Sequence, residues 1–76
     1  MQNATPSASD PAIRTELLAV ALDMSREGIE KWIRAGHIPQ RTLHRNKRTV
    51  CWPLSTLRAW NPRVAKRLDM LLIALA

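Results

Sequence analysis

The feature that most constrains the fold is a short helical segment that the sequence itself brings to an end. Residues 28–39 read GIEKWIRAGHIP, with apolar side chains spaced three to four residues apart, as on one face of a helix. Gly36 stands where a helix commonly ends in a left-handed residue. Pro39 prevents the helix from continuing, because proline has no backbone N–H and its ring clashes with the preceding turn. The sequence therefore predicts a helix over residues 26–35 that Ser25 caps.

Charge is distributed unevenly along the chain. The 76 residues include twelve Lys and Arg but only six Asp and Glu, and the formal net charge is +6. Between Lys31 and Leu68 the sequence has ten basic residues and no acidic one. Such asymmetry is typical of a protein that binds a polyanion. A basic solubilising surface is the alternative, but 38 residues without an acid favour a nucleic-acid partner.

The predicted helix has one apolar face and one polar face. The apolar stripe, which we expect to point inward, consists of Ile29, Ile33 and, in part, Trp32. The polar face carries five charged residues: Arg26, Glu27, Glu30, Lys31 and Arg34. Arginine can donate two hydrogen bonds to guanine and glutamate can accept one from cytosine, so Arg26 and Glu30 are candidates for reading bases. The alternative is a solvated face, stabilised by ion pairs between residues four apart. These pairs are Glu27–Lys31 and Glu30–Arg34.

The segment before this helix is predicted to hold a disordered arm and one further helix. Residues 1–11, rich in Ala, Ser, Thr, Pro and Asn, have little apolar content and are predicted to be disordered. A helix is expected to start after Thr15, whose side chain would cap it, with an apolar face from residues 17–22. Residues 23–25, Asp-Met-Ser, then form a tight turn in which Asp23 can adopt a left-handed conformation.

The segment after Pro39 is predicted to form a two-stranded hairpin. Residues 42–43 make one short strand and residues 49–52 the other, whose β-branched and aromatic side chains suit a strand. The tip between them, residues 44–47, contains Asn46, a residue type suited to a turn. A solvated basic loop is one interpretation of this segment, and contact with a nucleic-acid backbone is the other. The candidate contacts are Arg41, His44, Arg45, Asn46, Lys47 and Arg48.

Two helices are expected beyond the hairpin, over residues 53–60 and 62–75. Asn61 and Pro62 mark the start of the second, a capping residue followed by proline in the first turn. The C-terminal MLLIALA is apolar on every side, so it either covers the small core or packs on another subunit. A helix lying on a membrane surface is disfavoured, because the polar and apolar halves are separated along the axis rather than around it. The candidate oligomerisation residues are Met70, Leu71, Leu72, Ile73 and Leu75.

Two short helices joined by a tight turn, followed by a basic hairpin, have the order of a winged helix-turn-helix. Residues 19–25, AVALDMS, resemble the A-x-x-L-G-V-S turn of MerR-type domains, with Asp23 in place of glycine. Residues 29–39, IEKWIRAGHIP, are similar to the V-x-x-W-I-x-x-G-x-I-P segment of the same domains. Small phage excisionases and the Cox regulators of P2-like phages share this architecture, and the AWN of residues 59–61 resembles the Cox proteins in particular.

The resemblance implies a mainly α fold with a small two-stranded wing and a C-terminal helix. It divides the chain into a disordered arm (1–11), a winged helix-turn-helix domain (12–61) and a C-terminal helix that can serve oligomerisation (62–76). The recognition helix would enter the major groove, and the wing would lie on phosphates or in the adjacent minor groove. The recognition residues implied are Ser25, Arg26, Glu27, Glu30, Lys31 and Arg34. Within these residues there is no long coiled coil, effector domain or metal-sensing cysteine set of full MerR regulators, so the chain fits the excisionase size class.

The function implied is that of a phage or prophage protein in the cytoplasm of a bacterial host. It would bind short repeated sites on double-stranded DNA cooperatively and bend the DNA. That architecture would promote excision by an integrase, repress a promoter, or do both. The nearest alternative is a plain repressor or an antitoxin-like autoregulator without a role in recombination. An alternative from another class is a protein-interaction or membrane-surface module whose basic stretch binds acidic partners.

No enzyme, cofactor or metal site is predicted. The sequence has no nucleophile paired with a base, no paired carboxylates and no phosphate-binding loop. His37 and His44 stand alone, without the spacing of metal ligands. The single cysteine, Cys51, lies in a predicted strand and is expected in the core. Trp52 and Trp60 are expected to build the core between the hairpin and the helix that follows it.

Overall fold

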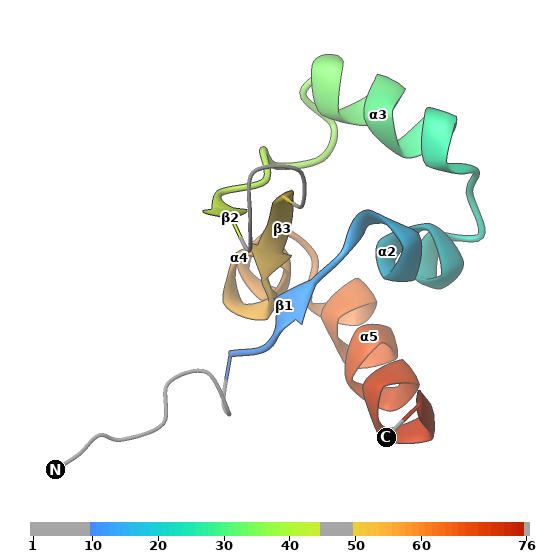
Figure 1. The fold of residues 1–76 in the computed structure, drawn as a ribbon, viewed down its shortest axis with the longest axis vertical. Coiled ribbons are helices and arrows are strands. Elements are labelled where there is room, and N and C mark those ends of the chain that lie inside the picture. The colour runs from blue at the N-terminus through green and yellow to red at the C-terminus, as the bar shows by residue number, and fades with distance from the viewer. Residues whose placement is uncertain (1–9, 45–49, 76) are drawn as a thin grey trace, which may run out of the picture.

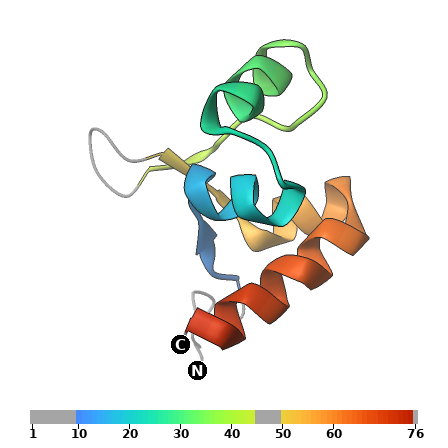
Figure 2. The same cartoon turned by 90° about the vertical axis from the view of Figure 1, so that its right-hand side faces the viewer.

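Two pairs of helices are separated by a pair of short strands in the computed structural model, which describes residues 10–44 and 50–75, and a further short strand precedes the first pair (Figure 1). The elements are, in chain order, β1 (Ala12–Ile13), α2 (Thr15–Leu22), α3 (Arg26–Arg34), β2 (Leu43–His44), β3 (Val50–Pro53), α4 (Leu54–Trp60) and α5 (Pro62–Leu75). The predicted mainly helical class is confirmed. Figures 1 and 2 place α3 at one end of the molecule and the C-terminal end of α5 at the other.

The described sheet has three strands. The predicted hairpin is confirmed as the antiparallel pair β2 and β3, whereas the third strand, β1, was not predicted. β3 is central: β1 pairs with it antiparallel on one edge, with Ile13 opposite Trp52, and β2 pairs with it antiparallel on the other, with Leu43 opposite Cys51. β1 is only two residues long. Its sequence shows no alternation that could reveal it, because two residues are too few to establish a period.

Two residues of the predicted arm, Asp10 and Pro11, contact the start of α4. The carboxylate of Asp10 accepts hydrogen bonds from the backbone N–H and the hydroxyl of Ser55, at 2.7 and 2.8 Å. The carbonyl of Pro11 accepts from Leu54 N–H at 3.0 Å. Together they bind amides of the first turn of α4, which have no partner within the helix. Disorder was therefore the wrong prediction for residues 10 and 11, whereas residues 1–9 lie outside the described part of the chain.

The turn between α2 and α3 follows the sequence-based prediction in its backbone. Asp23 has φ 55° and ψ 46°, the left-handed conformation expected of it. The N–H of Met24 donates to the carbonyl of Ala19 at 2.9 Å, which completes the hydrogen bonding of a helix end with a left-handed residue. The hydroxyl of Ser25 then accepts from Gly28 N–H at 3.0 Å and so caps α3. Both predictions for this turn are confirmed.

The start of α2 differs from its prediction. Thr15 is the first helical residue rather than the cap, and Arg14 takes the cap position without a side-chain hydrogen bond. Thr15 is instead 4% exposed, and its hydroxyl accepts a hydrogen bond from Arg41. At α5 the predicted cap is confirmed, because Asn61 Oδ1 accepts from the N–H groups of Arg63 and Val64 at 3.2 and 3.4 Å.

Trp52 is the largest of the fully buried side chains in the described part of the chain. It is fully buried, and its indole N–H donates to the carbonyl of Pro39 at 2.8 Å, which joins β3 to the loop after α3. Cys51 is fully buried too, as predicted. Trp60 lies half-buried at the margin of the core and donates to the carbonyl of His37 at 3.0 Å. The core side chains also include Ile13, Leu18, Ala21, Ile29, Ile33, Ile38, Leu54, Leu57, Val64, Ala65 and Leu68.

Helix α5 spans the predicted residues, 62–75, and packs against α2 and α4. Leu68 is fully buried, and the guanidinium of Arg67 donates to the carbonyl of Ala21 at the C-terminal end of α2, at 2.8 Å. Arg58 and Asp69 form an exposed ion pair between α4 and α5 at 3.5 Å. The first half of α5 is thus part of the folded unit.

Candidate nucleic-acid interface

Helix α3 presents a row of charged side chains on the side away from the core. Ile29 and Ile33 are buried, at 0% and 5% exposure, and hold the opposite side of the helix on the protein. Glu27, Lys31 and Arg34 are exposed and spaced three to four residues apart, so they share one face. We call these three residues the outward stripe. Among the described residues, no side chain forms an ion pair with any of them.

The two ion pairs considered for a solvated α3 are absent from the described part of the chain. Glu27 and Lys31 are both exposed but are not within ion-pair distance. Glu30 does not pair with Arg34 because both of its carboxylate oxygens accept from Arg41. The outward stripe is therefore not held by pairing along its own helix.

Arg26 has an intramolecular partner at the start of α2. Its guanidinium lies 2.9 Å from the carboxylate of Glu16, which is also 3.9 Å from Arg14. The side chains of Arg26 and Glu16 are 66% and 58% exposed. Pairs this exposed contribute little to stability, so Arg26 remains able to exchange Glu16 for another anion.

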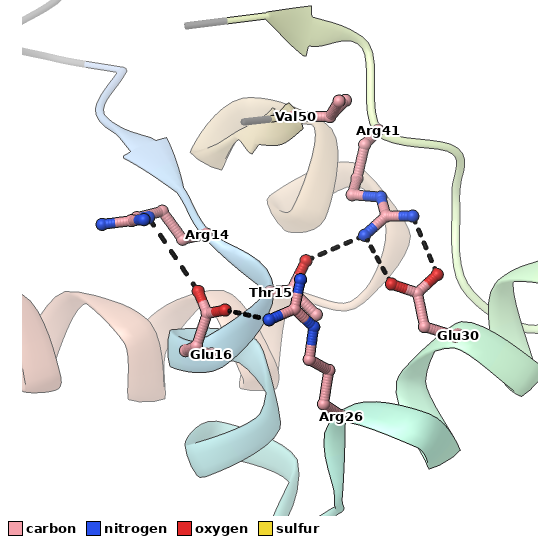
Figure 3. Close-up of a pocket in the computed structure, with 7 residues that line it drawn as sticks. All are labelled: Arg14, Thr15, Glu16, Arg26, Glu30, Arg41 and Val50. Atoms are coloured by element: carbon pink, nitrogen blue, oxygen red, sulfur yellow. Dashed lines mark hydrogen bonds and ion pairs between the residues drawn. The ribbon is translucent and has the colours of Figure 1, made fainter. Parts of the chain in front are cut away.

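Arg41 and Glu30 form a partly buried, bidentate ion pair (Figure 3). Two parallel N–H···O bonds of 2.9 Å join the guanidinium to the carboxylate, and one of the donating nitrogens also bonds the hydroxyl of Thr15 at 2.9 Å. The guanidinium carbon lies 5.7 Å from the centre of the Trp52 ring, within range of a cation–π interaction. The Arg41 and Glu30 side chains are 22% and 33% exposed. We call Thr15, Glu30 and Arg41 the arginine clamp.

The clamp changes the acid–base property of Glu30. The hydrogen bonds from Arg41 lower the pKa of the Glu30 carboxyl below its ordinary value of 4.5, and partial burial opposes this shift. The positive charges of Arg41, Arg26 and Arg34 lower the pKa of Glu30 further. The ionised carboxylate of Glu30 is therefore paired with an arginine of the same chain rather than left to solvent.

A polar cleft lies between the start of α2, the start of α3 and the base of the hairpin (Figure 3). Three of its lining residues, Arg26, Glu30 and Arg41, were candidate contacts in the sequence. Arg14, Thr15, Glu16 and Val50 complete the lining and were not. No sequence signal could assign them, because the partners in its hydrogen bonds are 10, 11 and 26 residues apart and meet only after folding.

The hairpin candidates fall largely outside the described part of the chain. His44 ends β2 and is exposed, opposite Val50 of β3. Arg45, Asn46, Lys47 and Arg48 lie among residues 45–49, outside the described part. Their part in binding stays a prediction. Arg41 lies just before β2, at the predicted base of the same surface, and its guanidinium is part of the clamp.

An aromatic pair lies beside the C-terminal end of α3. Trp32, which the sequence places in part on the inward stripe, is 41% exposed. Its ring contacts the exposed His37 edge to face, with centroids 5.7 Å apart and an interplanar angle of 69°. The chain between them turns at Gly36, whose φ of 83° confirms the predicted left-handed helix end. These rings extend the exposed surface of α3 with an apolar area.

The C-terminal half of α5 divides its apolar side chains between core and solvent. Leu71 and Leu72 are partly buried against the core. Met70, Ile73 and Leu75 are 63%, 77% and 73% exposed. The groove along this helix is lined by Arg63, Lys66, Arg67, Met70, Leu71 and Ala74. The first possibility raised by the sequence is thus confirmed in part, since two of the leucines cover the core. Packing on another subunit stays a prediction, and three apolar side chains are exposed where it would occur.

Further findings limit the kind of site that the described residues offer. No three His, Cys, Asp or Glu side chains of residues 10–44 and 50–75 gather closely enough to hold a metal ion. In the same part of the chain no helix has the length and apolar content needed to cross a bilayer. Comparison with known proteins gave no match: no family model, curated protein or solved structure is significantly similar to this chain.

Proposed function

We propose that this protein is a sequence-specific double-stranded DNA-binding protein that acts as a winged helix-turn-helix. In this proposal α2, the turn of residues 23–25 and α3 form the helix-turn-helix, and α3 enters the major groove. The β2–β3 hairpin is the wing and contacts the backbone next to the same base pairs. Support comes from the order of these elements and from the basic, acid-free stretch of residues 31–68, which contains the last turn of α3 and the hairpin.

The outward stripe is the observation that carries the proposal. Its three side chains lie on a helix whose other side is fixed by two buried isoleucines, and among the described residues none of them has an ion-pair partner. Lys31 and Arg34 can donate to guanine, and Glu27 can accept from the amino group of cytosine. Glu30 is a weaker candidate for that role, because both of its oxygens already accept from Arg41.

The biological role that we propose is that of a phage or prophage regulator in the bacterial cytoplasm. Several copies bind adjacent sites, bend the DNA, and promote excision by an integrase, repress a promoter, or do both. Self-association is supported by the exposed Met70, Ile73 and Leu75, which form an apolar end on α5. A plain repressor or antitoxin-like autoregulator without a role in recombination would use the same surfaces.

A titrated gel shift tests the binding itself. The probes are the DNA upstream of the protein's own coding sequence and a scrambled duplex of equal length, at about 150 mM salt, where nonspecific binding is weak. We expect discrete shifted bands on the upstream DNA alone. A smear of equal strength on both probes would contradict sequence-specific binding and leave a basic interaction module as the better explanation. Circularly permuted probes then measure bending.

Four alanine variants separate the proposed roles of helix and wing. Lys31→Ala and Arg34→Ala should weaken binding to the specific site by about tenfold each, with a smaller effect on scrambled DNA. Arg45→Ala and Lys47→Ala should weaken binding to every duplex about equally, because phosphates carry no sequence information. Equal losses on both probes from all four changes would rule out α3 as the reading helix.

A variant that ends at Asp69 tests the apolar end of α5. It keeps Leu68 in the core but removes the three exposed apolar side chains. We expect it to be monomeric in sedimentation, to bind a single site with unchanged affinity, and to lose cooperativity on tandem sites. Because this variant also removes the partly buried Leu71 and Leu72, the triple change Met70→Gln, Ile73→Gln and Leu75→Gln is the matched control. Unchanged cooperativity in the triple variant would rule out this face as the contact between copies.

A further inference from the structure

Arg41 is the one described side chain whose polar and aromatic contacts join all three parts of the proposed DNA-binding surface. It lies just before β2, at the base of the hairpin. Its guanidinium bonds Glu30 on α3 and Thr15 at the start of α2, and lies over Trp52 of β3. Figure 3 shows the side chain reaching from the hairpin segment across to both helices.

The clamp constrains the orientation of the Arg41 guanidinium as well as its distance from α3. The bidentate bonds to Glu30 fix the plane of the guanidinium, because two parallel N–H···O bonds permit one relative orientation. The contact with the buried Trp52 and the bond to the buried Thr15 fix where that plane lies. Rotation of α3 relative to the hairpin would break at least one of these contacts.

We propose that Arg41 is a positioning residue that sets the angle between α3 and the hairpin, and thereby determines DNA specificity without contacting DNA. This inference rests on the proposed function, since it explains how the outward stripe and the wing meet the same few base pairs. It replaces the expectation, drawn from sequence, that Arg41 contacts phosphate as part of the wing.

The state of Glu30 supports positioning over direct contact. Arg41 is only 22% exposed, and transfer of its guanidinium to a phosphate would leave a partly buried carboxylate without its partner close to DNA. Lys31 and Arg34, which have no ion pair among the described residues, can meet a phosphate at no such cost. In this proposal Arg41 therefore fixes the position of α3, whereas Lys31 and Arg34 bind DNA.

The salt dependence of binding distinguishes a positioning residue from a phosphate contact. Each phosphate neutralised by a cation contributes about 0.9 to the slope of log K against log salt concentration. Arg41→Gln should lower affinity for the specific site by about tenfold, leave affinity for scrambled DNA unchanged, and leave the slope unchanged. Lys31→Gln, the matched control on the outward stripe, should reduce the slope by about 1 if it contacts a phosphate, or else reduce specificity at one base pair.

Two further variants separate positioning from a loss of folding. Arg41→Lys keeps the charge but cannot form the bidentate pair, so it should reproduce the loss of specificity seen with Arg41→Gln. Arg58→Lys makes the same change at the exposed pair with Asp69 and should bind DNA like the wild type. Affinities are corrected for the folded fraction, measured by urea titration of the same samples. If the Arg41 variants do not fold, Glu30→Gln supplies the measurement, because it loosens the clamp from the other side.

The outcomes are distinct for the inference and for the proposed function. A slope that falls by about 1 in Arg41→Gln means that Arg41 contacts phosphate, which overturns the inference and leaves the function intact. Wild-type specificity per folded molecule in Arg41→Lys and Glu30→Gln means that the clamp only stabilises the fold, which also overturns it. Absence of any sequence preference in the wild type removes the proposed function and the inference together.

Discussion

Two arginine–glutamate pairs flank the N-terminal half of α3, and in both the closest nitrogen–oxygen distance is 2.9 Å. Arg26 meets Glu16 with both side chains more than half exposed, through one hydrogen bond. Arg41 meets Glu30 with both side chains a third exposed or less, through two hydrogen bonds, with a threonine and a tryptophan beside the guanidinium. The two ion pairs therefore have the same nitrogen–oxygen distance but differ in solvent exposure and in the number of hydrogen bonds.

The difference teaches that burial and geometry decide what such a pair contributes. An exposed pair gains little in water and loses side-chain entropy, so its net effect is small. A partly buried bidentate pair loses more hydration, but once formed it is stiff, and removal of one partner leaves the other without its hydrogen bonds. On this basis the Arg26 pair can open towards another anion, such as the phosphate of the proposed DNA partner, whereas the Arg41 pair belongs to the scaffold.

The largest expected effect comes from Arg41→Ala. It removes three hydrogen bonds to Thr15 and Glu30 and should lower the free energy of unfolding by about 1–3 kcal/mol. Urea titration followed by tryptophan fluorescence measures it, because Trp52 is buried in the folded state. A loss no greater than that of Arg26→Ala would show that the two pairs are energetically alike, and the contrast between them would disappear.

The contact between Asp10 and Ser55 joins distant segments without an arginine and can be compared with the two ion pairs. Asp10→Ala removes the two bonds from Ser55 that cap α4 and should cost about 1 kcal/mol, as the loss of a capping side chain commonly does. The same urea titration measures this change, with Asp10→Asn as the matched control, since an amide oxygen still accepts one bond. No change in Asp10→Ala would mean that the folded unit begins after residue 10.

Acid should weaken the inner pair in a predictable direction. The pKa of Glu30 is lowered in the folded protein, so its stabilising effect is complete above the ordinary value of 4.5 and is lost as the pH falls through the lower folded-state value. The unfolding free energy of the wild type should therefore fall more steeply in this range than that of Glu30→Gln. Parallel pH profiles for the two proteins would contradict a lowered pKa of Glu30.

The smallest effect is expected for Arg26→Gln. It should change the unfolding free energy by less than about 0.5 kcal/mol, and the difference should shrink as salt rises, because salt screens exposed charges. Urea titrations at about 0.05 and 0.5 M salt measure it. A larger loss that salt does not reduce would place Arg26 in the scaffold with Arg41, and its availability to DNA would then be excluded.

Features set by local sequence could be predicted. The left-handed Asp23, the cap by Ser25, the end at Gly36 and the cap by Asn61 all depend on residues within a few positions, and the structure confirms each of them. The bounds of α5 were predicted for the same reason, because its start signal is local. The buried Trp52 and Cys51 followed from their place in a strand.

Features that join distant segments could not be predicted. Asp10 meets Ser55 across 45 positions, and Thr15 meets Arg41 across 26. The nearer pairings offered by the sequence misled: Glu30 had Arg34 four residues away but pairs with Arg41 beyond the helix end. Thr15 looked like a cap for α2 yet became a buried partner of the clamp. The cation with which an acidic side chain pairs depends on where the packed core places the backbone. The spacing of charges along one helix therefore cannot predict the partner.

The outward stripe also bears on how such a protein changes its target over generations. Its three side chains contact no ion-pair partner within the described residues, while the isoleucines that hold α3 lie on the opposite side. Substitutions at Glu27, Lys31 and Arg34 can therefore accumulate with little loss of stability. Under the proposed function, the DNA site could therefore change through these positions while the fold is kept, and a library randomised at the same positions is the starting point for retargeting the protein.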